Sequence, residues 1–170
     1  MQGKPSSSNF VSVSTSSIGT DFAKFKSAFP LQRFAQPHSK LEWVYYQAGP
    51  NGSHPILFLH GTSSTAAVFF YQVKALAEKG YRVISAQYPA FGSPEEFCKG
   101  FDLFLDAMKC RSAHLIGAGL GGYLLQHFAG RYCARVRSLV LCNAFASTHA
   151  FADRIGTLGW TIHLMPSPIL

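Results

Sequence analysis

The sequence predicts an α/β fold in which a mostly parallel sheet is flanked by helices. The continuous apolar segment at residues 55–59 is typical of a central parallel strand, which is buried on both faces. Strand-like segments then alternate with helical ones, and this alternation indicates parallel strands joined by crossover helices. A third observation is a glycine-rich turn that joins the apolar run at residues 113–116 to a helical segment.

The first residues differ in composition from the rest of the chain. Residues 1–20 are rich in Ser and Thr and contain one lysine and no acidic residue. Such a segment cannot bury enough apolar surface to fold, so we expect a disordered tail over residues 1–21 and ordered structure from Phe22. An organelle-targeting leader is the alternative, and the lack of arginine in this segment disfavours it.

Hydrophobic periodicity and turn residues place the remaining elements in order. Two strands come first, and the second alternates Leu41, Trp43 and Tyr45 on one face. Helical patterns with an apolar face then separate the later strands, as in βαβ units. The expected strands cover residues 29–34, 41–47, 55–59, 81–86, 113–116 and 136–142, and the expected helices cover residues 66–79, 95–109 and 123–129.

Composition excludes several classes of protein. The chain has 170 residues, 48% of them hydrophobic and 14% charged, which is typical of one globular domain with a sizeable core. Its net charge of +7 would suit nucleic acid, but the basic residues are spread along the chain and the densest group is only Arg131, Arg135 and Arg137. Because no RNA-binding or helix-turn-helix signature accompanies them, we expect no nucleic-acid partner.

Cysteine spacing and hydropathy bear on the compartment. Cys98, Cys110, Cys133 and Cys142 include no C-x-x-C pair, so they are predicted to be reduced, mostly buried thiols of an intracellular protein. No segment is predicted to span a membrane, because the apolar residues 155–170 are too few and are interrupted by prolines.

The glycine-rich turn has two interpretations. In the first, the frame G-x-S-x-G lies over residues 117–121 and forms a nucleophile elbow, a strained turn between a strand and a helix that presents a serine. Gly117, Gly121 and Gly122 supply the elbow glycines. The position of the nucleophile is Gly119, which has no side chain, so the slot is vacant.

In the second interpretation, Gly117, Gly119 and Gly122 spell G-x-G-x-x-G, the fingerprint of a dinucleotide-binding module. This reading requires an acidic residue roughly 20 positions on, at the end of the next strand. The residue there is Asn143. A dinucleotide domain also opens with its glycine turn, whereas this turn lies deep in the chain. The dinucleotide-binding module remains an alternative, although it lacks the acidic residue that would bind the ribose.

Three motifs together resemble the α/β-hydrolase superfamily. Residues 57–61 resemble its third strand and the turn that lends an oxyanion-hole amide, residues 80–93 its fourth strand and following loop, and residues 114–122 its elbow. The resemblance implies an α/β-hydrolase fold truncated after about the sixth strand, with residues 22–148 as its core and residues 149–170 as the start of a lid or cap. Without a seventh strand, residues 136–142 would form an exposed apolar edge.

Further segments are similar to one family of that fold, the maspardins. They are residues 44–50, 65–70, 87–89, 96–101 and 138–143. This similarity implies a non-catalytic, protein-binding factor of intracellular trafficking or signalling, in the cytoplasm and peripherally associated with endosomal or trans-Golgi membranes. It implies no cofactor and does not identify the protein partner. The elbow of that family usually keeps a serine, and this chain departs from the pattern at Gly119.

Acyl transfer on this fold needs a nucleophile, a base, an acid that orients the base, and an oxyanion hole. The resemblance places the hole at the amides of Thr62 and Leu120, whereas Gly119 has no group that could attack a substrate. Glycine also relieves the strain of the elbow, which costs another residue about 1–3 kcal/mol. We therefore expect a vestigial oxyanion hole without catalytic residues, and a protein that is not an enzyme.

In the hydrolase order, the acid and the histidine follow the elbow. Asp153 and His163 have that order but are only ten residues apart, whereas a helix and a strand normally intervene, so both are expected to be ordinary residues. His60 is expected to shape the oxyanion turn. His114 and His127 are isolated in apolar contexts, so no metal site is predicted. The alternative function is an esterase-like serine hydrolase whose acid and histidine lie beyond this chain.

Overall fold

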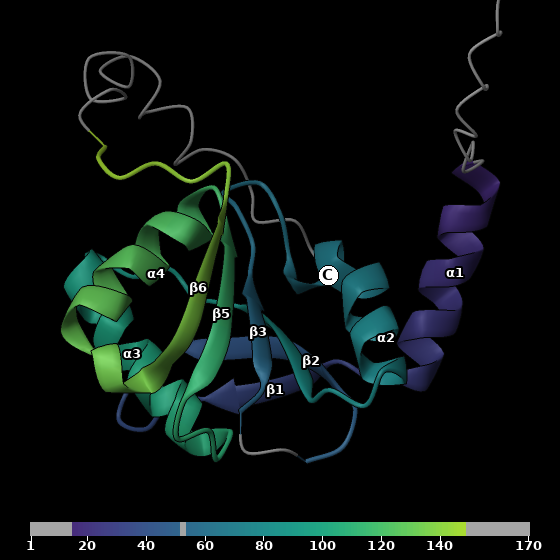
Figure 1. Cartoon of the computed structure of the whole chain (residues 1–170), viewed down its shortest axis with the longest axis horizontal. Helices are drawn as coiled ribbons and strands as arrows, with labels where there is room; N and C mark the ends of the chain where they lie inside the picture. The colour runs from purple at the N-terminus through teal and green to yellow at the C-terminus, as the bar shows by residue number, and fades with distance from the viewer. Residues whose placement is uncertain (1–14, 52–53, 149–170) are drawn as a thin grey trace, which may run out of the picture.

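The computed structural model describes residues 15–51 and 54–148, which form a six-stranded sheet with helices on both faces (Figure 1). The strands are β1 (Gln32–Ala35), β2 (Glu42–Ala48), β3 (Ile56–Leu59), β4 (Val83–Gln87), β5 (Ala113–Ala118) and β6 (Val136–Cys142). The helices are α1 (Thr15–Ala28), α2 (Phe70–Glu78), α3 (Pro94–Ala107) and α4 (Leu120–Arg131), with 3-10 turns η1 (Ala66–Phe69) and η2 (Cys133–Arg135). The predicted fold class is confirmed.

The strand order is β1-β2-β4-β3-β5-β6. β4, β3, β5 and β6 run parallel to one another, while β2 is antiparallel to both β1 and β4. The connection from β3 to β4 runs through α2, and that from β5 to β6 runs through α4. The carboxyl ends of β3 and β5 therefore meet at one edge of the sheet, with Leu59 paired to Gly117.

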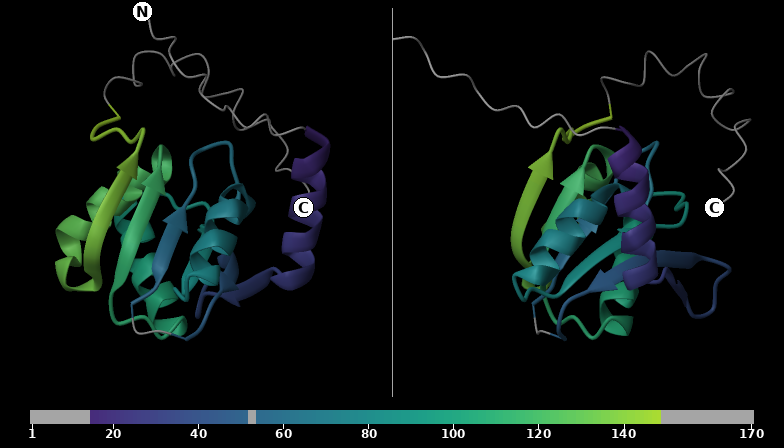
Figure 2. Two further views of the ribbon diagram at one scale, coloured as in Figure 1. Left: turned by 45° about the vertical axis from the view of Figure 1, so that its right-hand side comes forward. Right: turned by 90° about the vertical axis from the view of Figure 1, so that its right-hand side faces the viewer.

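Two hydrophobic cores lie on opposite faces of the sheet. Figures 1 and 2 show α1 and α2 on one face and α3 and α4 on the other. Along β3 the side chains alternate: Leu57 and Leu59 pack toward α3 and α4, while Phe58 packs toward α1 and α2. The period of two in a strand produces this division, and the apolar run at residues 55–59 serves both cores.

Strand β2 is buried on both faces, although it lies near the edge of the sheet. Trp43 and Tyr45 belong to the core under α3 and α4, and Tyr46 belongs to the core under α1 and α2. The Trp43 indole stacks on the ring of Phe104, with 4.6 Å between centroids. The expected alternation of Trp43 and Tyr45 on one face is correct, and the opposite face is covered as well.

Local sequence signals set the starts of two elements. The Ser93 hydroxyl accepts a hydrogen bond from the amide of Glu96, and Pro94 occupies the first turn of α3. This pairing of a serine cap with a proline is a frequent helix start. The Thr65 hydroxyl likewise accepts from the amide of Ala67 at the start of η1. The first four residues of the expected helix at residues 66–79 therefore form the 3-10 turn η1, and the α-helix α2 follows from Phe70.

Helix α1 begins at Thr15, before Phe22, so the expected boundary of the disordered tail lies too far along the chain. Phe25 of this helix is 2% exposed and packs against Tyr46 and Phe70, with ring centroids 5.0 and 5.8 Å away. These aromatic contacts anchor α1, whose first residues, 15–21, fall within the expected tail. Residues 1–14 and the expected lid at residues 149–170 lie outside the described part of the chain.

The cysteines are less buried than expected. Cys98 and Cys110 are buried, and burial raises the pKa of both thiols. Cys133 and Cys142 are exposed, because η2 and the end of β6 lie at the surface, so the expectation of mostly buried thiols is wrong for half of them. Across residues 15–51 and 54–148, no helix has the length and apolar character needed to cross a bilayer.

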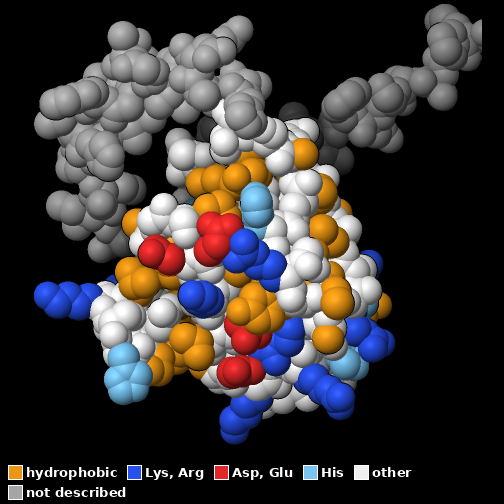
Figure 3. Space-filling view, turned by 90° about the vertical axis from the view of Figure 1, so that its left-hand side faces the viewer, with side chains coloured by type: hydrophobic (Ala, Val, Ile, Leu, Met, Phe, Trp, Pro, Cys, Tyr) orange, Lys and Arg blue, Asp and Glu red, His pale blue; other side chains and the backbone are white. Residues whose placement is uncertain are grey.

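The outer face over α3 and α4 carries mixed charge (Figure 3). Arg131 lies 2.6 Å from Glu95, and Arg135 lies 3.0 Å from Asp102 and 2.7 Å from Asp106. Two members of the densest arginine group thus have carboxylate partners on α3. This arrangement fits a solvated face on which the charges of α4 and η2 are paired with those of α3.

Candidate functional site

The site is built around Gly119, which lies between the end of β5 and the start of α4. Its φ of 51° and ψ of −117° belong to a region that glycine adopts readily and other residues only with strain. The Gly119 amide donates to the carbonyl of Cys142 at 3.0 Å, and its carbonyl accepts from the amide of Tyr123 at 3.1 Å. These bonds hold the sharp turn in the form of a nucleophile elbow.

The other elbow glycines are required by close packing. A β-carbon on Gly121 would stand 2.6 Å from the carbonyl oxygen of His60, and one on Gly117 would stand 2.6 Å from the amide nitrogen of Gly122. One on Gly122 would meet the β-carbon of Ala144 at 2.5 Å. The missing side chains allow the helix start to approach β5 and the turn after β3.

Gly119 itself is different, because a side chain would fit there. The nearest atom to a β-carbon on Gly119, among the residues that the structure describes, is the α-carbon of Gly61 at 3.7 Å. This is an ordinary van der Waals contact. The slot is therefore open to a side chain, and the positive φ is the local reason that favours glycine.

The two predicted oxyanion amides lie on the segments that border this slot. Leu120 is the first residue of α4, so its N–H has no acceptor one turn earlier within the helix. Thr62 is exposed in the turn after β3. The pairing of Leu59 with Gly117 brings this turn beside the elbow. Thr62 and Leu120 stay predictions as oxyanion donors.

His60 is 5% exposed and lies at the base of the same turn. Its Nδ1 is 2.7 Å from the carbonyl oxygen of Gly61. Because a carbonyl only accepts, Nδ1 carries the proton and donates it to this bond. Its Nε2 is buried and has no hydrogen-bond partner within the described ranges. Burial lowers the pKa of His60, and the bond to Gly61 opposes this in part.

Tyr88, which the sequence did not predict as a site residue, supports His60. The two rings stack with 4.7 Å between centroids at 9°, and the Tyr88 hydroxyl donates to the His60 carbonyl oxygen at 3.0 Å. Burial raises the pKa of Tyr88 to about 12, so the phenol keeps its proton. The sequence signal that could have indicated Tyr88 is the segment at residues 87–89, which the sequence analysis used only for the similarity to maspardins.

The acidic side chains of the described residues are engaged away from the elbow. Ion pairs join Glu42 to Arg33 and Glu78 to Lys74, and Glu95, Asp102 and Asp106 pair with arginines as given above. Asp21 accepts from Tyr71 and Glu96 from the amide of Gly92. None of these contacts orients a histidine. Asp153 and His163 fall outside the described residues.

The remaining histidines are dispersed. His114 lies on β5 with its Nδ1 2.8 Å from the Ser138 hydroxyl, and His127 lies on α4 beside Tyr123, with 4.6 Å between ring centroids. No group of three or more His, Cys, Asp or Glu that could hold a metal ion occurs within residues 15–51 and 54–148. Asn143, at the end of β6, has a left-handed φ of 49°, which asparagine tolerates better than most residues.

Comparison with known proteins agrees with this geometry. Residues 54–160 match the family described as alpha/beta hydrolase fold. The chain is 45% identical to maspardin of Danio rerio and 40% identical to maspardin of Homo sapiens, each over 161 residues that make up 90% of this chain and 50% of the relative. It thus spans about half the length of these curated relatives.

Among solved structures, a carboxylesterase from Bacillus subtilis is similar with a TM-score of 0.59 and 19% identity, over 74% of this chain and 48% of that one. At this identity the similarity shows the fold alone. The hydrolase fold accounts for the glycine turn after β5 as an elbow, and the dinucleotide-binding interpretation is left without support.

Proposed function

Since the chain belongs to the alpha/beta hydrolase fold family, we propose that it is a non-catalytic member of that family. Its role would be that of a maspardin-like, protein-binding factor in intracellular trafficking or signalling, peripherally associated with endosomal or trans-Golgi membranes. The vacant nucleophile slot carries the non-catalytic part of this proposal. The similarity to maspardins, 40–45% identity over 90% of this chain, supports the rest.

The slot supports loss of catalysis because its vacancy has no steric cause. Among the described residues, a β-carbon at Gly119 would meet only Gly61, at 3.7 Å, so a serine could stand there. Its absence removes the atom that would bond to an acyl group. Glycine relaxes the strained backbone at this position, as is expected where selection for catalysis has been lost.

The alternative is an esterase-like serine hydrolase whose acid and histidine lie beyond this chain. The observation in its favour is the elbow backbone, which keeps the φ and ψ of a strained turn although no side chain uses it. The two functions differ in one respect that can be measured: a base positioned at the elbow would activate a serine placed at residue 119.

The experiment compares wild type with Gly119→Ser in the longest natural form of the protein, because the alternative places its acid and histidine beyond this chain. Both are treated with a fluorophosphonate probe and with p-nitrophenyl acetate, and the Bacillus subtilis carboxylesterase serves as the positive control. We expect no labelling and no hydrolysis above background for either form, because an unactivated serine is a weak nucleophile. Stoichiometric labelling at residue 119 of the variant would contradict the proposal and favour the hydrolase.

A fractionation experiment tests the binding role. The tagged chain is expected on endosomal and trans-Golgi membranes, and alkaline carbonate should release it. Treating the membranes with protease beforehand should abolish rebinding if the receptor is a protein. Rebinding that survives protease would assign the interaction to lipid and contradict the protein-binding part of the proposal.

A further inference from the structure

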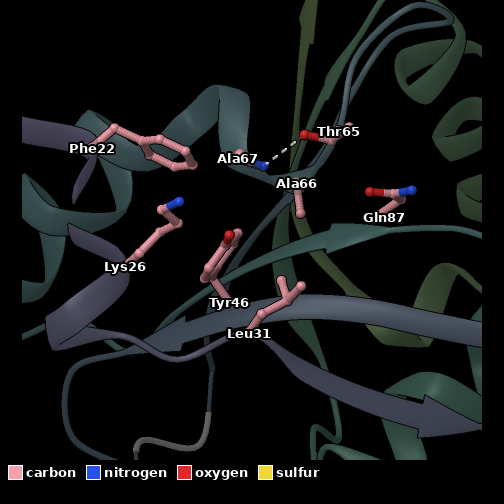
Figure 4. Close-up of a pocket in the computed structure, with 8 residues that line it drawn as sticks. All are labelled: Phe22, Lys26, Leu31, Tyr46, Thr65, Ala66, Ala67 and Gln87. Atoms are coloured by element: carbon pink, nitrogen blue, oxygen red, sulfur yellow. Dashed lines mark hydrogen bonds between the residues drawn. The ribbon is translucent and has the colours of Figure 1, made fainter. Parts of the chain in front are cut away.

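A cavity of about 240 Å³ lies between α1 and the sheet, on the face that carries α2 (Figure 4). Its walls come from α1, from the segment before β1, from β2, from the start of η1 and from the end of β4. The lining residues are Phe22, Lys26, Leu31, Tyr46, Thr65, Ala66, Ala67 and Gln87. No residue of the elbow lines this cavity, so it is separate from the site described above.

The buried wall of the cavity carries an unpartnered polar group. Tyr46 is 5% exposed, and its side chain extends from β2 into the space below Ala66 (Figure 4). Its hydroxyl makes no hydrogen bond within residues 15–51 and 54–148, whereas the hydroxyls of Tyr71 and Tyr88 each have an acceptor. Burial raises the pKa of Tyr46, so the phenol remains a hydrogen-bond donor.

The open side of the cavity carries a positive charge. Lys26 extends from α1 with its Nζ 5.0 Å from the centroid of the Phe22 ring, and its ammonium group faces the same space as the Tyr46 hydroxyl (Figure 4). Among the described residues that line the cavity, none is acidic. The Thr65 hydroxyl and the Gln87 amide supply further donors at the rim. The polar groups thus favour a ligand that accepts hydrogen bonds and carries negative charge.

We propose that this cavity binds a small monocarboxylate with an apolar body, with the carboxylate held between Lys26 and Tyr46. The body would contact the Phe22 ring, Leu31 and the methyl groups of Ala66 and Ala67. A cavity of about 150 Å³ holds the six carbon atoms of benzene. By that scale, 240 Å³ suits about ten non-hydrogen atoms, the number in octanoate.

A neighbouring groove extends the apolar surface. It has a volume of about 460 Å³ and shares Phe22, Thr65 and Ala67 with the cavity. Ile18 and Val68 are among its other lining residues. A longer alkyl chain could continue into this groove, so dodecanoate should bind at least as tightly as octanoate. The proposal goes beyond the function above and does not depend on it, because no step involves Gly119.

The test is a calorimetric titration of the full 170-residue chain with octanoate, octanol and octylammonium. Octanoate is expected to bind saturably with a Kd below about 1 mM. Octanol, which lacks the charge, should bind at least tenfold more weakly, and octylammonium should not bind. Absence of saturable octanoate binding, or octanol binding as tightly as octanoate, would overturn the proposal.

Three variants locate the site. Lys26→Gln should weaken octanoate binding about tenfold and leave octanol unchanged, because only the charge-assisted bond is lost. Tyr46→Phe should weaken octanoate several-fold while keeping the aromatic wall. Lys24→Gln is the matched control, since Lys24 lies on the same helix but lines a different hollow. Equal losses for Lys24→Gln and Lys26→Gln would show a general charge effect and overturn the assignment.

Discussion

The Tyr88 hydroxyl donates a hydrogen bond of 3.0 Å to the carbonyl of His60 while its ring stacks on the His60 imidazole, 4.7 Å between centroids. One side chain therefore holds both the backbone and the ring of the residue that begins the turn after β3. The same His60 carbonyl oxygen is one of two carbonyl oxygens, with that of Leu59, that leave no room for a β-carbon on Gly121. The turn and the elbow are thus fixed against each other by contacts on both sides.

The first prediction concerns this bond. Tyr88→Phe keeps the stacked ring but removes the hydroxyl, so a part-buried carbonyl loses its donor. We expect the free energy of unfolding to fall by about 1 kcal/mol, measured by urea denaturation. Tyr71→Phe is the control, since the Tyr71 hydroxyl bonds to Asp21 at an exposed site, and its effect should be clearly smaller than that of Tyr88→Phe. Equal losses would contradict a special role for Tyr88.

The second prediction is a pH dependence of stability that originates at His60. Burial lowers the pKa of His60 in the folded chain, whereas in the unfolded chain the pKa is about 6.5. As the pH falls below that value, the unfolded chain takes up a proton that the folded chain does not, so stability is lost toward acid. Between pH 7.5 and 5.5, the wild type should lose up to about 1 kcal/mol more than His60→Asn. Parallel pH profiles for the two proteins would rule out this contribution.

The third prediction separates two reasons for glycine in the elbow. Gly121→Ala would place a methyl group 2.6 Å from two carbonyl oxygens, so the backbone must shift, and the loss should be about 3 kcal/mol. Gly119→Ala meets no such obstacle and should cost only the strain of a positive φ, about 1 kcal/mol. Urea denaturation of both variants gives the order. A larger loss for Gly119→Ala would show that the slot is more crowded than its contacts indicate.

The fourth prediction concerns β6, which is the last strand of the sheet in the described part of the chain. Val140 and Leu141 of this strand are 47% and 43% exposed, as expected for an apolar edge. Such an edge can pair with another chain. Val140→Lys should therefore reduce concentration-dependent association in analytical ultracentrifugation. Leu103→Lys, at a 42% exposed position on α3, should leave association unchanged, and equal effects of both would point to general solubility.

Most of the fold could be predicted because its signals are local. The apolar run that forms β3 and the alternation of Trp43 and Tyr45 in β2 follow directly from strand periodicity. The elbow could be located because each of its positions requires or favours glycine, either because a β-carbon would clash there or because φ is positive. The start of α1 could not, because Thr15–Ala28 is ordered by aromatic contacts between Phe25, Tyr46 and Phe70, which are distant in sequence.

The candidate site was only partly predictable for a similar reason. The vacancy at Gly119 is visible in the sequence, but the open space around it is a property of the packed turn at Gly61. The support of His60 by Tyr88 depends on β3 and β4 lying side by side. The exposure of Cys133 and Cys142 follows from their places in η2 and at the end of β6, which residue type alone does not indicate.

Strand β2, with Trp43 on one face and Tyr46 on the other, has a consequence for how the molecule opens. β2 contributes side chains to the core on each face of the sheet. If either pair of helices separated from the sheet, β2 would be exposed on one face and would support the other core less well. The two cores should therefore lose their packing in a single cooperative step. The backbone amides of β2 and of its neighbour β4 should exchange with solvent only through that step, and thus more slowly than those of α1 at the periphery.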